Sequence, residues 1–187
     1  MLNAPFPPIE TTRLCLRCVT LEDAVPTSAL MSPAVSDWLA SWPLPFTVEM
    51  AKHRIDLARA AAIRGDALPC AIVVKQSETL AGWITLSRRE DDIGRGALGY
   101  WLGEAHHRQG FTREALSALI PAGFDRLNLE VIEAGAQAEN AGSFAVMRAC
   151  GMFEVGERMV HATSRGRLER CIFYETHWPA SSMRRLD

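Results

Sequence analysis

The stretch 97–115, ALGYWLGEAHHRQGFTREA, joins an apolar run to a polar turn that ends in a glycine and opens into a helical pattern. The apolar run, 97–102, suits a strand covered on both faces. Apolar residues recur at helical spacing from Phe111 onward, so backbone N–H groups near Gly110 have no partner within the helix. Because glycine has no Cβ, the backbone there can approach a phosphate closely. These features predict a phosphate site, although a glycine needed only for turn geometry gives the same pattern.

A second segment, 139–153, adds polar residues at helical spacing. It follows a strand-like run over 129–137 and predicts a short helix that Asn140 caps and Gly151 ends. Asn140 and Ser143 lie one helical turn apart, so their side chains share a face. An ordinary helix cap also explains Asn140, and a small residue in the first turn explains Ser143. The residues alone leave both interpretations open.

In these two segments the chain resembles the GCN5-related N-acetyltransferases, the GNAT superfamily, and within it the group of ribosomal-protein N-terminal acetyltransferases and their relatives. The resemblance covers nearly the whole chain, and its separate matches follow the order of the family. The matching stretches are 10–17, 20–24, 81–84, 98–102, 109–111 with Glu114 and Ala115, and finally Asn140, Ser143 and 151–153.

The resemblance implies an α/β protein with the GNAT fold, in which helices flank a central mixed, mostly antiparallel twisted sheet. The fourth and fifth strands, near 98–102 and 131–137, splay apart in that fold. The pantetheine arm of acetyl-CoA fills the gap and pairs with the free strand edge. From the length of the chain we expect a single domain over 1–187, with an extended N-terminal arm at 1–8 and a frayed tail at 179–187.

The resemblance also implies an activity. The chain is expected to transfer the acetyl group of acetyl-CoA, its cosubstrate, to a primary amine by direct attack. The acceptor is a protein N-terminus or a small-molecule amine, and the alternative is a noncatalytic domain that binds or senses acyl-CoA. The expected cofactor-binding residues are Leu102, Arg108, Gln109, Gly110, Phe111, Thr112, Arg113, Asn140 and Ser143. The expected acceptor-binding residues are Trp38, Trp42, Trp83 and Tyr100.

Ser143 and Tyr100 are the expected catalytic residues. The family pattern places Asn140 on the pantetheine arm and Ser143 near the sulfur, where a hydroxyl can hydrogen-bond the leaving thiolate. A backbone N–H of Tyr100 or Trp101 is expected to polarise the thioester carbonyl.

Two residues depart from the family pattern. Arg108 stands where the loop usually has an earlier glycine, and it either changes the loop path or adds guanidinium donors for the phosphates. Ala97 stands where the family often has a glutamate, the usual candidate for a general base. We therefore expect water, a backbone carbonyl or a carboxylate of the acidic run 90–92 to remove the amine proton. The resemblance places that run near the acceptor, although a solvated loop is its simplest interpretation.

Residues beside the loop have simpler interpretations. His106 and His107 are adjacent and therefore unsuited to bind one metal together, so we expect either solvated surface residues or a rim of the phosphate pocket. Glu114 suits the first turn of a helix whatever its function. Pro121 is expected to kink the helix or to end its regular part.

Composition narrows the class of protein further. The 20 basic and 22 acidic residues give a formal charge of -2, which provides no broad basic field for nucleic acid. We expect no membrane span, a cytoplasmic location, and a monomer or homodimer. The five cysteines are odd in number and scattered, so free thiols are expected. Cys15 and Cys18 lie three apart in a predicted strand and point to opposite faces, which disfavours a metal site.

The remaining pattern predicts the elements that position these residues. Aromatic residues interrupted by prolines over 38–46 form an irregular connection, in which Trp38 and Trp42 either cover the core or wall the acceptor pocket. The predicted strands are 13–19, 70–76, 79–87, 153–160 and 170–177, with a two-residue turn at 77–78 and a basic turn at 163–167. The other predicted helices are 48–64 and 21–31, the latter short or broken because it contains Pro26.

Overall fold

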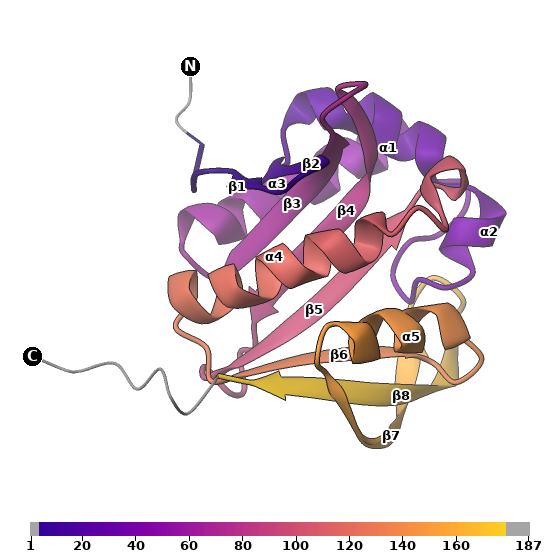
Figure 1. Cartoon of the computed structure of the whole chain (residues 1–187). Helices are drawn as coiled ribbons and strands as arrows, with labels where there is room; N and C mark the ends of the chain where they lie inside the picture. Colours follow the sequence, from indigo (N-terminus) through magenta and orange to yellow (C-terminus); the bar gives the residue numbers. More distant parts are fainter. Residues whose placement is uncertain (1–3, 179–187) are drawn as a thin grey trace, which may run out of the picture.

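The computed structural model describes residues 4–178, in which eight strands form one sheet (Figure 1). The sheet order is β1-β2-β3-β4-β5-β6-β8-β7. All neighbours pair antiparallel except β5 and β6, which are parallel. The strands are β1 (Ile9–Glu10), β2 (Leu14–Cys18), β3 (Ala67–Val74), β4 (Thr79–Arg88), β5 (Arg95–Leu102), β6 (Val131–Gln137), β7 (Phe153–Ala162) and β8 (Arg167–His177). The tail expected at 179–187 lies outside the described residues, as do residues 1–3 of the arm.

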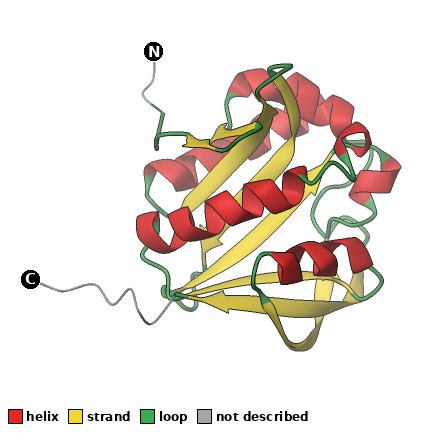
Figure 2. Ribbon diagram, viewed as in Figure 1, coloured by secondary structure: helices red, strands yellow, loops and turns green. Residues whose placement is uncertain are grey.

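Helices cover both faces of the sheet (Figure 2). The α-helices are α1 (Ala24–Leu30), α2 (Pro33–Ser36), α3 (Val48–Ile63), α4 (Phe111–Arg126) and α5 (Ala141–Ala149). Two short 3-10 helices, η1 (Leu21–Asp23) and η2 (Glu104–His106), complete the set. Helices α4 and α5 lie on the near face in Figure 1, and α1 and α3 lie behind the sheet.

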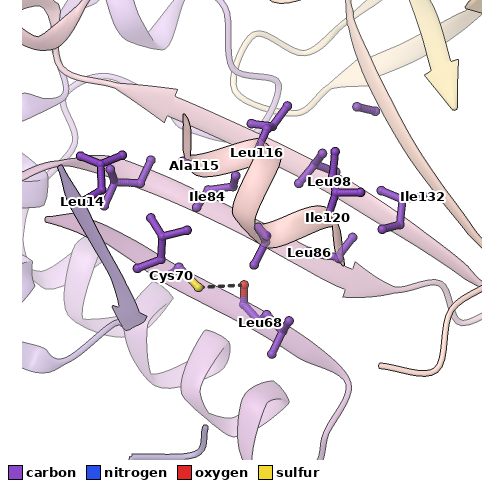
Figure 3. Close-up of a cluster of buried hydrophobic side chains, with 14 of the residues drawn as sticks. Leu14, Leu68, Cys70, Ile84, Leu86, Leu98, Ala115, Leu116, Ile120 and Ile132 are labelled. Atoms are coloured by element: carbon purple, nitrogen blue, oxygen red, sulfur yellow. Dashed lines mark hydrogen bonds between the residues drawn. The ribbon is translucent and has the colours of Figure 1, made fainter. Parts of the chain in front are cut away.

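Two buried clusters hold these layers together. On the α4 side, Leu116 and Leu119 pack with Ile84 and Leu86 of β4 and with Ile132 of β6 (Figure 3). All five are fully buried, and each such side chain stabilises the fold by about 1.5–3 kcal/mol relative to exposure. The second cluster lies on the α3 side and is rich in tryptophan: Trp42, Trp83 and Trp101 pack there with Phe46, Ala51 and Ile55.

Several predictions of local structure are confirmed. The helix predicted at 21–31 is broken, since η1 ends at Asp23 and α1 continues to Leu30. Helix α4 begins immediately after Gly110, and α5 is capped by Asn140. Helix α5 ends at Ala149, and Gly151 follows the C-cap Cys150 with a φ of 79°, the left-handed conformation that favours glycine.

Other predictions are wrong for physical reasons. Strand β5 is not covered on both faces: Ala97 and Gly99 are exposed, because a cavity borders that face. Of the two effects expected of Pro121, an end of the helix is wrong: α4 continues to Arg126 with the proline on its exposed side. The turn between β3 and β4 has four residues, 75–78, and not two.

The extended arm at the N-terminus is also packed more closely than its prolines suggest. Phe6 is buried in the cluster under α4, and the Arg126 guanidinium lies 6.0 Å from its ring. Arg126 also donates to the Pro7 carbonyl at 2.8 Å. The two-residue strand β1, which the sequence did not indicate, then joins the sheet edge.

A pair of glycines on neighbouring strands tests this packing. A Cβ at Gly82 of β4 would lie 2.1 Å from the backbone oxygen of Trp101, whereas a Cβ at Gly99 of β5 would meet nothing within 4 Å. We expect Gly82→Ala to lower the free energy of unfolding by about 1–3 kcal/mol or more, because backbone atoms must move. The matched Gly99→Ala variant should unfold as the wild type does. Equal stability of the two variants in denaturant titrations would contradict this register.

Candidate functional site

The site begins where β5 and β6 part. Their parallel register runs from Arg95 and Val131 to Leu98 and Ala134 and ends there. Strand β5 continues to Leu102 and β6 to Gln137. The two strands therefore leave an open edge on each side of a gap, as the predicted splay requires.

Hydrogen bonds at both ends of the β4–β5 ladder show which β5 groups face this gap. Gly103 N–H donates to the Ala81 carbonyl at 2.9 Å, and Arg89 N–H donates to the Arg95 carbonyl at 2.9 Å. In an antiparallel ladder, residue pairs that are hydrogen-bonded alternate with pairs that are not. Counting from either end, Trp101 of β5 and Trp83 of β4 form a hydrogen-bonded pair. The N–H and C=O of Tyr100, one residue earlier, point away from β4 and into the gap.

A cavity of about 1580 Å³ runs through this gap and on to the face of the sheet covered by α3. Most of the residues predicted for the site line it. They are Leu102, Arg108, Thr112, Asn140 and Ser143 from the cofactor set, and Trp38, Trp42, Trp83 and Tyr100 from the acceptor set. Segments far apart in the sequence thus meet at one cavity.

The loop before α4 has the geometry of an anion site. Gly110 is the N-cap of α4 with a φ of 77°, and the first amides of the helix have no partner within it. Arg108 has a φ of 59°, also left-handed, where the family usually has glycine. The bulky residue thus adopts a conformation that glycine takes more readily, at a cost of about 1–2 kcal/mol. Its side chain lines the cavity, which favours the guanidinium-donor interpretation over an altered loop path.

Four residues of the predicted cofactor set, Gln109, Gly110, Phe111 and Arg113, do not line the cavity. Phe111 is buried in the core, and the Gln109 side-chain amide donates to the Ala105 carbonyl at 2.8 Å. Arg113 is exposed on the first turn of α4. Gly110, Phe111 and Arg113 do not form walls of the cavity. They remain candidates for cofactor binding because the start of α4 offers backbone N–H groups and the charge of Arg113.

Arg13 and Glu114 hold this loop in place. The Glu114 carboxylate accepts from the Thr11 hydroxyl at 2.6 Å, from the Arg13 backbone N–H at 2.8 Å and from the Arg13 guanidinium at 2.7 Å. Arg13 also donates to the Gln109 carbonyl at 2.8 Å and lies 4.7 Å from the Phe111 ring. Burial raises the pKa of Glu114, but the hydrogen bonds from Thr11 and Arg13 outweigh it and keep the pKa below its usual value. The structural role predicted for Glu114 is confirmed.

The two histidines of the loop differ. His107 lines the cavity, and its Nε2 lies 2.8 Å from the Leu102 carbonyl at the end of β5. His106 packs against Phe111, with 6.3 Å between ring centroids, and burial followed by the charge of His107 lowers its pKa. Of the two expected alternatives, His107 therefore fits the rim of the cavity and not a fully solvated surface residue.

Asn140 and Ser143 lie across the gap from β5. Asn140 Oδ1 accepts from the Ser143 N–H at 3.0 Å, so the cap uses the oxygen and leaves the Nδ2 amide free to bond elsewhere. The Tyr100 hydroxyl donates to the Ser143 carbonyl at 3.4 Å, which links β5 to α5. Burial raises the pKa of Tyr100 to about 12, so the phenol is protonated at neutral pH.

The aromatic residues of the acceptor set divide into core and wall. Trp42 and Trp83 are buried and in edge contact, with 5.5 Å between centroids, and both also border the cavity. The Trp83 indole donates to the Thr27 hydroxyl at 2.9 Å. Trp38 is 46% exposed and stands at the cavity mouth. Trp42 and Trp83 therefore both cover the core and border the cavity, whereas Trp38 is exposed at its mouth; contact of these residues with an acceptor stays a prediction.

The turn between β7 and β8 fixes the segment that carries Trp38. Arg165 donates to the Leu39 carbonyl at 3.1 Å, and Ser164 N–H donates to the Ala40 carbonyl at 2.9 Å. The Glu169 carboxylate orients Arg165 through a 2.7 Å ion pair, which lowers the pKa of Glu169. Sequence reasoning missed this connection because its partners lie about 125 residues apart.

Sequence reasoning also missed one wall of the cavity, the face of α3. Met50, Arg54 and Leu57 line it, together with His53 and Ala61. Their spacing of three and four residues was the available signal. An ordinary solvated helix shows the same spacing, and no local feature of the sequence indicates that this face of α3 borders a cavity.

The acidic run 90–92 lies elsewhere, which corrects its expected place near the acceptor. Asp91 and Asp92 line a separate charged cavity with Arg89 and Arg95. Hydrogen bonds from Arg89 lower the pKa of Asp91 to about 2. Neither carboxylate borders the cavity that holds Tyr100 and Ser143. Of the three expected proton acceptors, only water and a backbone carbonyl remain as the chain's replacements for the missing glutamate.

Within residues 4–178, no three His, Cys, Asp or Glu side chains are grouped to hold a metal ion. The helices of this part of the chain are all too short or too polar to span a membrane.

Comparisons with known proteins agree with the fold and the site. Residues 13–153 match the acetyltransferase (GNAT) domain family. The chain is 32% identical over 160 residues to an uncharacterized N-acetyltransferase p20 of Bacillus licheniformis, which covers 84% of this chain and 89% of that protein. The chain therefore belongs to the GNAT family and is an acetyltransferase.

Solved structures show the same fold. A putative ribosomal-protein-serine acetyltransferase from Vibrio cholerae is 26% identical with a TM-score of 0.75, over 94% of this chain and 100% of that one. RimJ from Mycobacterium smegmatis, in complex with CoA-disulfide, is 21% identical with a TM-score of 0.81, over 97% of this chain and 92% of that one. The predicted fold and family are confirmed, with ribosomal-protein acetyltransferases among the neighbours.

The Arg13–Glu114 pair gives a prediction of pH dependence. A carboxyl whose pKa is lowered by folding stabilises the protein above its unfolded value of 4.5, and this contribution disappears as pH falls through the folded pKa. Because Arg13 is half exposed, we expect Glu114→Gln to cost only about 1–2 kcal/mol at neutral pH. The difference from wild type in denaturant unfolding should shrink as the pH is lowered toward about 3. A difference that stays constant with pH would contradict this assignment.

Proposed function

We propose that this protein binds acetyl-CoA in the gap between β5 and β6 and transfers its acetyl group to a primary amine by direct attack. The observation that supports this most strongly is the Tyr100 backbone, which faces the gap beyond the last paired residues, Leu98 and Ala134. An extended arm with amide groups can pair with such a free edge as another strand would. The phosphates would then lie at the start of α4, with Arg108 as a further donor.

In this proposal the Tyr100 N–H polarises the thioester carbonyl. A backbone donor held in a sheet needs no reorganisation as negative charge develops on that oxygen. Trp101 is unsuitable for this role because its N–H is committed to β4. The two hydroxyls near the gap, those of Tyr100 and Ser143, can donate to the thiolate that leaves. The raised pKa of Tyr100 keeps its hydroxyl available as a donor.

The amine must lose a proton before or during attack. With Ala97 in place of the family glutamate, we propose that water or a backbone carbonyl accepts it. Proximity of amine and thioester supplies up to about 7–11 kcal/mol of barrier lowering without a strong base. The acceptor is a protein N-terminus or a small amine; the Vibrio cholerae neighbour is described as a putative ribosomal-protein-serine acetyltransferase.

The test is release of CoA thiol and formation of acetylated product from acetyl-CoA and a panel of peptides and small amines. We expect Ser143→Ala to lower the turnover number by about tenfold to a thousandfold, because the lost donor acts mainly as charge develops on sulfur. Its affinity for acetyl-CoA should change much less. An unchanged turnover number would mean that Ser143 is only a helix residue. Acetyl-CoA binding with no turnover of any amine would favour the noncatalytic alternative.

Two substitutions of Asn140 distinguish its role as a helix cap from a role in cofactor binding. Serine also caps helices but lacks the Nδ2 donor, so Asn140→Ser should keep the wild-type melting temperature. Its dissociation constant for acetyl-CoA, measured by calorimetry, should rise about fivefold through loss of one hydrogen bond. Asn140→Ala should lose both the helix cap and the affinity for acetyl-CoA that Nδ2 contributes, and its free energy of unfolding should fall by about 1 kcal/mol. Wild-type affinity of Asn140→Ser would leave Asn140 as a cap alone.

A further inference from the structure

The far end of the cavity, beyond the gap, has a cation with an unusual environment. Arg54 projects from α3 over the Trp42 ring, with 4.2 Å from the guanidinium carbon to the ring centroid. One guanidinium nitrogen donates to the Ser41 carbonyl. Within residues 4–178, no carboxylate lies within ion-pair distance of Arg54. A half-buried guanidinium thus faces a cavity with most of its donors unused.

A half-buried guanidinium without an anionic partner destabilises the protein unless a ligand pairs with it. Burial lowers the pKa of Arg54, which shows that its surroundings disfavour the charge. Stacking on Trp42 compensates in part, since the negative face of the indole ring attracts a cation. The stacked, planar guanidinium is also preorganised to receive two oxygens of one anionic group.

A second unpaired donor borders the same region. The indole N–H of Trp101 is buried and has no hydrogen-bond partner among the described residues. Its ring contacts Trp42 edge-on, with 5.1 Å between centroids, so Trp101 and Arg54 both lie against one tryptophan. A buried N–H without a partner destabilises the protein, and a hydrogen bond to an acceptor oxygen would remove this cost.

The other groups at this end define the rest of the ligand. Trp38, Met50 and Leu57 are exposed apolar side chains that line the cavity. Of the acids that line the cavity, Glu169 is already paired with Arg165 and Arg167, whereas Glu49 and Glu139 are exposed to solvent, which screens their charge. His53 also lines the cavity but is exposed, so among the described residues Arg54 is the half-buried cation on this apolar wall that has no carboxylate partner.

We propose that this end of the cavity binds an acceptor amine that carries an anionic oxygen group, a carboxylate in particular, on an apolar body, with Arg54 as the partner of the anion. The inference rests on the proposed function, because it assigns the acceptor of that same site. The carboxylate has two sources, an amino-acid-like small molecule or an acidic residue beside the amino terminus of a peptide. Both present the same chemistry to Arg54.

The acceptor experiment uses pairs of amines that differ in one group. Free amino acids are compared with their amides, and peptides with Asp at the second position with those that have Asn there. We expect kcat/KM to favour the carboxylate member of the accepted class by about tenfold or more. Arg54→Gln should reduce this preference to less than about threefold, and Arg54→Lys, which keeps the charge but loses the planar fork, should retain only part of it.

Two controls separate recognition from structure. Lys52→Gln removes one positive charge from the exposed side of the same helix and should leave the preference unchanged. A purely structural role for Arg54, through Trp42 and Ser41, would lower kcat/KM for acid and amide alike. An unchanged acid-to-amide ratio in Arg54→Gln would overturn the proposal.

A binding probe makes the test independent of turnover. Phenylacetate and phenylacetamide share an apolar body and differ in charge. Calorimetry on the protein saturated with acetyl-CoA should show phenylacetate binding more tightly, and Arg54→Gln should abolish the difference. Equal binding of the two probes, or binding of neither, would contradict the proposal. If phenylacetate binds through Arg54 but no amine is acetylated, the proposed function fails and the anion site stands.

Discussion

The site depends on the end of the β5–β6 ladder. Up to Leu98 and Ala134 the two strands satisfy each other's backbone groups, and beyond this point those groups face a cavity. Unpaired strand edges are usually covered or blocked, because they pair readily with any extended chain. Here the edge lies inside the protein, between α4 and α5, where a ligand with amide groups can complete the sheet (Figure 1).

Everything else around the gap keeps this edge in position. The helix starts at Gly110 and Asn140 come from opposite sides of it, each set by a local capping geometry. Arg13 and Glu114 fasten the first of these to the start of β2, so the loop before α4 is attached to the rigid sheet. The β7–β8 turn does the same for the segment that carries Trp38. Binding groups thus lie on loops, and the sheet fixes the distances between them.

Local signals predicted correctly the two helix starts on which the proposed cofactor site depends. A glycine before an apolar helix pattern at Phe111, and Asn140 before another, are both rules of helix termini and need no tertiary information. The left-handed backbone of Arg108 was not predictable in this way, since arginine rarely adopts it and only the fixed loop ends require it. The prediction that β5 is buried on both faces was wrong because it relied on local composition alone. Its apolar composition resembles that of a covered strand, although one face borders a cavity.

The acceptor side could not be predicted from local pattern. Arg54 occupies an ordinary position on α3, and its significance comes from Trp42 and from the absence of a carboxylate partner within residues 4–178. Likewise, the acidic run 90–92 was assigned to the acceptor by family resemblance, but Asp91 and Asp92 are paired with Arg89 and Arg95 at another cavity. Long-range packing decides which charges are free to bind a substrate, and such packing leaves no signature at the positions themselves.

The central claim is that acetyl-CoA completes the sheet at β5. Amide hydrogen exchange of Tyr100 and Trp101, measured by NMR with and without saturating acetyl-CoA, tests it most directly. Because the Tyr100 N–H faces the gap and the Trp101 N–H is bonded to β4, only Tyr100 should become protected, by about tenfold or more. Binding of acetyl-CoA with no change in exchange at Tyr100 would contradict this account.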